Sequence, residues 1–249
     1  MPRQLSQNAP SGAWLFDVKF GRNESVTNGG WSPIVSSGTL NFLTAADTVR
    51  VKAGGNAADT SAGAGARTVT VVGLNSSWKL DSETLTLAGA SASSSSSKSF
   101  IRVFRAYVAT CGTYGGANTG AIVIESTGGT ALLTVPAGDG QSQHCQYTVP
   151  DGSSMRIVRV EAQVPSAKDA DLRLMVRQNA DTVAAPFSPA RVVGFRDGIA
   201  ASDVNGVYAE GLNLPPRTDV WIEAYGNGAG VSAIAEFDFY LITPPVDFD

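Results

Sequence analysis

Alternation of apolar and polar residues with a period of two constrains this chain more than any other feature. Residues 231–242, VSAIAEFDFYLI, place six apolar side chains on one face and Glu236 and Asp238 on the other. Residues 172–177 alternate in the same way, and residues 99–108, SFIRVFRAYV, are apolar on both faces, as in a central strand. Because no stretch of ten or more residues has a helical period, the chain is predicted to be all-β.

Turn residues separate the predicted strands at short intervals. The chain has 27 glycines and only 16% charged residues, a composition that suits tight turns between closely packed strands. Roughly ten to thirteen short strands are expected, which is typical of an antiparallel β-sandwich or jelly roll with long loops. The longer crossing loops are expected at residues 165–170 and 185–208. The remaining predicted strands are residues 14–20 (ended by Gly21), 39–43, 48–52, 67–72, 83–87, 121–125, 131–135, 144–149, 156–164 and 220–225.

The predicted organisation has two β regions. Residues 1–12 are polar without periodicity and are expected to form a flexible N-terminal arm. Residues 13–90 form an N-terminal β region, and the serine tract at residues 91–99, SASSSSSKS, is expected to be an exposed loop. Residues 100–249 form a jelly-roll-like β region that packs with the N-terminal region.

Charge and hydropathy exclude several classes of partner. The net charge is −4 without a basic stripe, so we expect no nucleic-acid partner. No apolar run is long enough to span a membrane, and the first residues show no signal peptide. Cys111 and Cys145 are too few for a disulfide scaffold; free thiols are the favoured interpretation, and a single disulfide between them stays open.

The residues offer little for catalysis. The one histidine, His144, is interpreted as a partly exposed strand residue, and its neighbour Cys145 would point to the opposite face. Strand carboxylates such as Glu125 and Glu223 are candidates for the acid pair of a glycoside hydrolase, but the sequence does not show whether any two of them lie close together. We therefore expect no enzyme, and a glycan hydrolase is the least favoured function.

Residues 54–66, GGNAADTSAGAGA, raise the question of a phosphate-binding loop. The stretch lacks the P-loop lysine and leads into a β-branched strand instead of a helix. It is interpreted as a mobile or interface-forming loop, with Arg67 exposed at the strand entry and available for a neighbour's carboxylate. Two acidic pairs do not continue into the spacing of a calcium loop, so neither a metal nor a cofactor is expected: Asp169 with Asp171, and Asp203 with Asn205.

Aromatic residues at expected loop positions give the one binding hypothesis that comes from the residues alone. Trp31 lies in NGGWSP, Trp78 lies in NSSW, and Tyr114 lies among glycines. Such rings can stack on sugars or contact another subunit. With Arg67, they are the candidate subunit-contact or glycan-facing residues, against the alternative that they seal the ends of a sandwich.

A set of motifs resembles a family of virion structural proteins of tailed bacteriophages, especially those of aquatic hosts. The resemblance extends from about residue 20 to residue 242. The motifs are FGRNESV (20–26), DTSAGAGARTVTVVGLNSSW (59–78), ETLTLAG (83–89), SFIRVFRAYV (99–108), YTVPDGSS (147–154) and EFDFYLI (236–242).

The resemblance implies a non-enzymatic, β-rich accessory component of the particle. An outer capsid decoration or cement protein is the favoured role, and a tail or head fibre component that binds a host receptor or glycan is the alternative. The implied partners are further copies of the chain, with a trimer as one option, and the major capsid protein or other virion proteins. The expected location is the virion, assembled in the host cytoplasm, and the negative charge favours its exterior.

Overall fold

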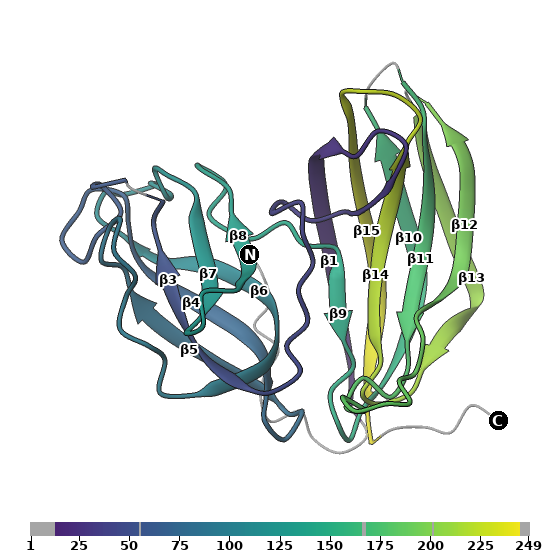
Figure 1. Ribbon diagram of the computed structural model, residues 1–249, viewed down its shortest axis with the longest axis horizontal. Helices are drawn as coiled ribbons and strands as arrows, with labels where there is room; N and C mark the ends of the chain where they lie inside the picture. The colour runs from purple at the N-terminus through teal and green to yellow at the C-terminus, as the bar shows by residue number, and fades with distance from the viewer. Residues whose placement is uncertain (1–12, 55, 166–167, 201, 245–249) are drawn as a thin grey trace. The chain divides into compact units, whose positions relative to one another are not determined.

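The computed structural model describes residues 13–54, 56–165, 168–200 and 202–244, in which the chain forms two units (Figure 1). Residues 13–39 and 145–244 build the first, and residues 40–144 the second. The described residues form fifteen strands and no helix, and all named strand pairs are antiparallel, so the all-β prediction is confirmed. Within them, no helix exists that could cross a membrane. The predicted arm at residues 1–12 lies outside the described residues.

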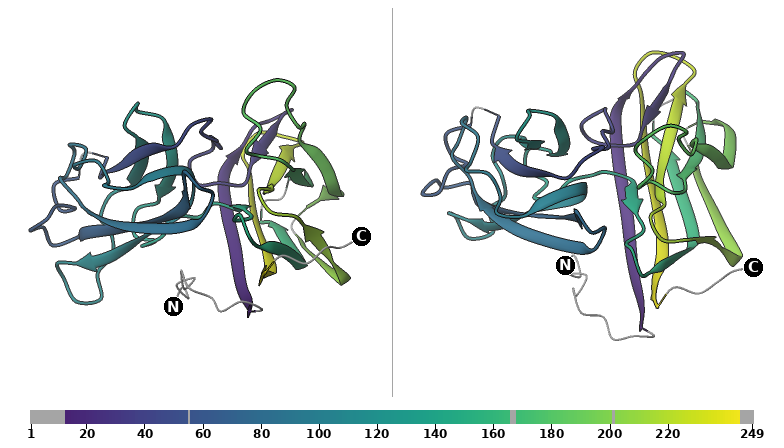
Figure 2. Two further views of the ribbon diagram at one scale, coloured as in Figure 1. Left: turned by 90° about the horizontal axis from the view of Figure 1, so that it is seen from below. Right: turned by 60° about the horizontal axis from the view of Figure 1, so that its bottom comes forward.

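The first unit is a jelly roll of two sheets, which lie side by side as layers in Figures 1 and 2. One sheet, called here the β15 sheet, has the order β1 (Ala13–Val26), β15 (Val231–Thr243), β10 (Ser154–Val164), β13 (Ser202–Leu214). The other, called the β14 sheet, has the order β12 (Arg191–Ile199), β11 (Ala170–Arg177), β14 (Asp219–Gly226), β2 (Trp31–Pro33), and β9 (Gln146–Thr148) also pairs with β14. This strand order in two facing sheets, with β2 and β9 both beside β14, is the jelly-roll topology.

Apolar side chains from both layers fill the jelly roll. The inward residues of β15 include Phe237 and Phe239, both fully buried, and the ring of Tyr147 from the opposite sheet lies 4.8 Å from that of Phe239. A bulge in β10 between Ile157 and Arg159 shifts the register against both neighbouring strands. Since one extra residue reverses the facing of all that follow, the bulge explains why the inward positions of β10 change parity along the strand.

The second unit is inserted in the jelly roll between β2 and β9. Its six-stranded sheet has the order β5 (Leu80–Thr86), β4 (Ala66–Asn75), β6 (Ser99–Cys111), β3 (Asp47–Lys52), β7 (Ile122–Ser126), β8 (Ala131–Val135). All six strands contribute to one apolar core, in which Val71, Phe100 and Ile124 are fully buried. The hairpin of β4 and β5 turns at residues 75–79.

The units divide the chain differently from the division expected at the serine tract. Ser96 is buried, and its Oγ accepts a hydrogen bond from the backbone nitrogen of Val49 at 2.8 Å. The Oγ of Ser93 accepts one from Val51 at 3.0 Å. The tract therefore runs along the backbone of β3 inside the second unit, because its hydroxyls satisfy donors that no strand reaches.

Three predicted boundaries are wrong. Residues 39–43 form no strand, and β1 continues past Gly21 to Val26. The loop predicted at residues 185–208 contains β12 and the first half of β13. β12 is an edge strand with almost no buried side chain and two register shifts against β11, so its residues show no alternation to read.

Candidate interaction surfaces and pocket

The four residues singled out in the sequence belong to different parts of the molecule. Trp31 lies in the jelly roll, on β2 and not in a loop, whereas Arg67, Trp78 and Tyr114 lie in the inserted unit. The two groups belong to separate units, so the sequence-based set does not form one site within either of them.

Arg67 holds the glycine-rich loop that precedes it. Its Nε donates to the carbonyl oxygen of Gly63 at 2.9 Å, and the side chain is half-buried. The loop itself closes around the buried carboxylate of Asp59, which accepts from the backbone nitrogens of Ala66 and Thr119. Internal hydrogen bonds thus hold the loop, and an interface-forming role for it stays a prediction.

Trp78 does not present its ring to solvent. It is buried at a turn with φ 59°, and its ring lies over the guanidinium of Arg102, 4.9 Å from centroid to Cζ. The ring of Phe42 lies at the same distance from that guanidinium. Arg102 is thus held between two rings, and the role of Trp78 in the described structure is packing.

Tyr114 is the residue among these four that is open to solvent. Its side chain is fully exposed in the turn that follows β6. Nothing lies within 4 Å of the position of a side chain at Gly115, so the turn stands clear of the unit. It is a candidate contact residue in both the glycan-binding and the subunit-contact hypotheses.

Trp31 belongs to an aromatic and charged cluster on the outer face of the β14 sheet. The guanidinium of Arg173 lies 4.0 Å from its ring centroid, and the rings of Tyr225 and Phe195 lie at 5.5 and 6.1 Å. Arg173 also makes an ion pair with Glu223 at 2.6 Å. The cluster is a rigid platform with one paired charge at its centre, because each group is held by a neighbour.

A second aromatic cluster lies on the outer face of the β15 sheet. Trp14 and Phe16 on β1 are 55% and 39% exposed, and both rings pack edge-on against Tyr240 of β15. The guanidinium of Arg156 lies 5.7 Å from the ring centroid of Trp14. Large apolar side chains grouped on an outer sheet face mark a surface for association. We call Trp14, Phe16 and Tyr240 the β1 aromatic patch.

Arg159 organises three carboxylates on the same sheet. It makes ion pairs with Glu161, Glu236 and Asp238 at 2.7, 2.6 and 2.8 Å. Glu161 and Glu236 lie directly opposite one another on β10 and β15, an unfavourable arrangement that the shared arginine offsets. Asp238 is buried, although it lies on the polar face of its strand.

The pKa of Glu236 gives a prediction for the pH dependence of stability. Burial raises this pKa; Arg159 offsets part of the effect, and Asp238 and Glu161 add to it. A carboxyl whose pKa is raised in the folded state stabilises the fold at pH values below its ordinary pKa. That contribution is lost as the pH rises through the raised pKa. Glu236→Gln stays neutral, so its free energy of unfolding should improve relative to the wild type between about pH 4 and pH 7.

Urea unfolding at the two pH values measures this effect. The matched control is Glu24→Gln, since Glu24 is a largely exposed glutamate on the same sheet that pairs with Arg22. The prediction is contradicted if both variants change in parallel with pH.

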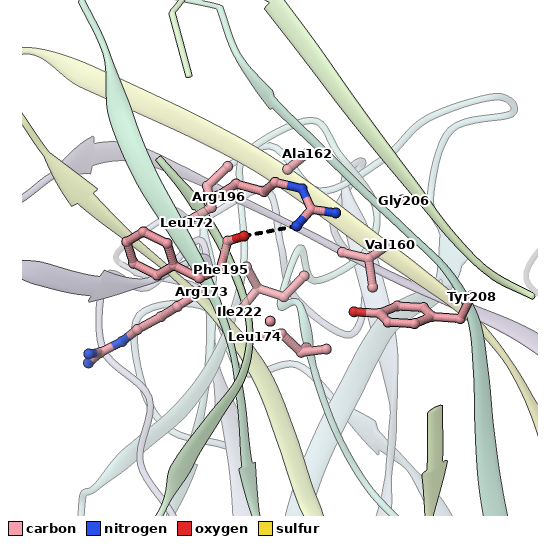
Figure 3. A pocket seen from close by; sticks show the side chains of 11 residues that line it. Val160, Ala162, Leu172, Arg173, Leu174, Phe195, Arg196, Gly206, Tyr208 and Ile222 are labelled. Carbon is pink, nitrogen blue, oxygen red and sulfur yellow. Dashed lines mark hydrogen bonds between the residues drawn. The ribbon is translucent and has the colours of Figure 1, made fainter. Parts of the chain in front are cut away.

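A pocket opens between the two sheets of the jelly roll, at the side where β12 and β13 are the edge strands (Figure 3). It encloses about 430 Å³, including solvent at its open mouth. Its aliphatic lining comes from three inner strands: Val160, Ala162, Leu172, Leu174 and Ile222. The side chains of Phe195, Arg196 and Tyr208 lie around this lining. These three residues were not predicted, because all fall in the stretch expected to be a loop.

The residues considered as catalytic candidates in the sequence make structural contacts in the fold or are buried. His144 is fully buried, not partly exposed, and its Nε2 accepts from the backbone nitrogen of Thr134. Burial raises the pKa of the Cys145 thiol far above its ordinary value. Glu125 pairs with Arg50 in the inserted unit, and Glu223 belongs to the jelly roll. Both cysteines are free, and no described His, Cys, Asp or Glu residues form a group of three suited to a metal.

Comparisons with known proteins do not assign the chain to a family. No family model matches the chain, and a search of curated proteins returns no match. Among solved structures, it is similar to a chain of the infectious bursal disease virus Gx strain, with 13% identity, a TM-score of 0.26, and coverage of 98% of this chain and 74% of that one. For T=1 particles derived from the same virus, the values are 11%, 0.28, 94% and 70%. TM-scores this low carry no argument, so the assignment of the jelly roll depends on strand order alone.

Proposed function

We propose that this chain is a non-enzymatic structural protein of a virus particle, and specifically an outer capsid decoration or cement protein of a tailed bacteriophage. The observation that carries the proposal is the β1 aromatic patch, a group of large rings on the outer face of a jelly-roll sheet. The jelly roll is a fold that capsid proteins use, which supports the proposal by analogy only. The phage part of the proposal depends on the resemblance of the sequence motifs to virion proteins of tailed bacteriophages.

In assembly, the β1 aromatic patch would be the contact surface with another subunit. Trp14 and Phe16 stand on the edge strand β1, so they are accessible both to a second copy and to a capsid protein. Homo-oligomers with closed symmetry bury such apolar groups at each contact. The net charge of −4 favours a place on the outside of the particle, away from the packaged genome.

Electron microscopy of labelled particles tests the proposed location. Density for the chain on the head supports a decoration protein, and density confined to the tail removes that role. Light scattering of the purified chain, with and without emptied capsids, reports its oligomeric state and its binding to capsids.

The double variant Trp14→Ser, Phe16→Ser should weaken self-association or capsid binding by about tenfold or more, since central aromatic contacts dominate interfaces. The matched control is Phe187→Ser, which removes an exposed ring from a loop of the same unit. Equal behaviour of the two variants in an analytical ultracentrifugation or capsid-binding assay counts against the β1 aromatic patch as the contact.

A second candidate function is a tail or head fibre component that binds a receptor or glycan. The cluster of Trp31, Tyr225, Phe195 and Arg173 favours it, because rigid rings beside polar groups suit sugar binding. Tyr114 is the corresponding exposed ring in the inserted unit. A glycan array and a host-cell adsorption assay distinguish the two functions, since a cement protein binds in neither.

A further inference from the structure

Two polar groups at the pocket between β12 and β13 have capacity that the protein does not use. Arg196 donates from Nη1 to the carbonyl oxygen of its neighbour Phe195 at 2.8 Å, and it makes no ion pair with a described carboxylate. A guanidinium has five N–H donors, so most of its capacity is unused. The hydroxyl of Tyr208 makes no hydrogen bond with a described residue, and Figure 3 shows it directed toward the aliphatic lining.

Arg196 differs in this respect from three other arginines on the jelly-roll sheets. Arg159, Arg173 and Arg177 each have a carboxylate partner within 3 Å. The acidic residue next to Arg196 is Asp197, and it interacts with Asp171 instead. A cation at a pocket mouth without a partner is a binding group for an anion.

Two glycines leave room for the polar side chains at the mouth of the pocket. The side chain of Tyr208 reaches across from β13, and its hydroxyl oxygen lies 3.2 Å from the position of a Cβ at Gly194. The side chain of Arg196 reaches from β12 toward β13, and its Nη2 lies 3.1 Å from the position that a Cβ would take at Gly206. The two polar side chains therefore cross between the edge strands, over an interior lined by aliphatic groups.

We propose that this pocket binds a small amphiphilic monocarboxylate. Its apolar body lies among Leu172, Leu174 and Ile222, and its carboxylate accepts hydrogen bonds from Arg196 and Tyr208. The space of about 430 Å³ includes the solvent at the open mouth, which favours a single slim chain that lies partly at the surface over a two-chain lipid. Among the residues that line the pocket, Arg173 is paired with Glu223 and Arg196 has no described carboxylate partner, so one unpaired positive charge is available to a monoanion.

Calorimetric titration with octanoate, and with octanamide as its uncharged counterpart, tests the proposal on the full chain. Octanoate should bind the wild type, and Arg196→Gln should weaken it by about tenfold or more, the loss expected for a charged hydrogen bond. Octanamide binding should be the same in both proteins. The matched control is Arg191→Gln on the same strand, since Arg191 is exposed and bonds Gln178 outside the pocket.

Methyl NMR of the wild type locates the bound probe without any variant. Octanoate should shift the methyl signals of Leu172, Leu174 and Ile222. The proposal is overturned by no binding of octanoate at millimolar concentration, by equal affinity for Arg196→Gln and the wild type, or by methyl shifts confined to other residues. These results do not bear on the particle role, because the pocket and the β1 aromatic patch share no residue.

Discussion

The Gly21→Ala variant is expected to lose most of the stability of the jelly roll, about 4 kcal/mol or more. A Cβ at position 21 would lie 2.2 Å from the carbonyl oxygen of Ile34 and 2.3 Å from the backbone nitrogen of Cys145. These two atoms form a hydrogen bond of 3.0 Å with each other. The added methyl group would stand inside that bond, and backbone atoms cannot move aside as a flexible side chain can.

Urea unfolding, followed by hydrogen exchange of peptides from each unit, measures the loss and shows which unit carries it. Peptides from residues 145–244 should lose protection. Gly128→Ala is the matched control, since its Cβ would meet only Ser126 Oγ at 3.6 Å, an ordinary contact. The prediction is contradicted if the free energy of unfolding of Gly21→Ala lies within about 1 kcal/mol of the wild-type value.

The Asp59→Ala variant is expected to destabilise the inserted unit by about 3–5 kcal/mol. The fully buried carboxylate accepts three backbone hydrogen bonds, from Ala66 at 2.8 Å, Thr119 at 2.9 Å and Gly120 at 2.7 Å. Removing it leaves three donors without an acceptor in a site closed to water, and each such donor costs roughly 1–3 kcal/mol.

The measurement is chemical unfolding together with hydrogen exchange of the amides at residues 66, 119 and 120. Asp139→Ala is the matched control, because Asp139 is an exposed aspartate of the same unit that pairs with Gln143. Protection of these three amides that survives in Asp59→Ala would show that another group holds the loop.

Much of the fold could be predicted, because strands with one buried face carry their pattern in the sequence. The alternation in residues 231–242 is the buried face of β15, and the two-sided apolar run at residues 99–108 is the central strand β6. Prediction failed at β12, whose side chains are exposed on both faces, and at β10, where a bulge reverses the facing of the side chains. An edge strand has no burial pattern to reveal it.

The candidate sites were less predictable, since contacts between distant strands create them. Trp31 could be selected as an aromatic in a turn-rich stretch, but its partners Arg173, Phe195 and Tyr225 come from three other strands. Arg196 and Tyr208 come together only because β12 and β13 are the edge strands on the same side of the sandwich.

The sequence by itself determined the fold class, the absence of a helical period and the strand that follows the glycine-rich stretch. The tertiary structure decided what that stretch does. Its glycines permit close approach: a Cβ at Gly65 would lie 2.2 Å from the carboxylate of Asp59, and one at Gly63 would lie 1.9 Å from the carbonyl oxygen of Ala58. Local sequence shows where the backbone can bend, but the Asp59 carboxylate also accepts from the backbone nitrogen of Thr119, 60 positions away, and only the folded chain brings that donor there.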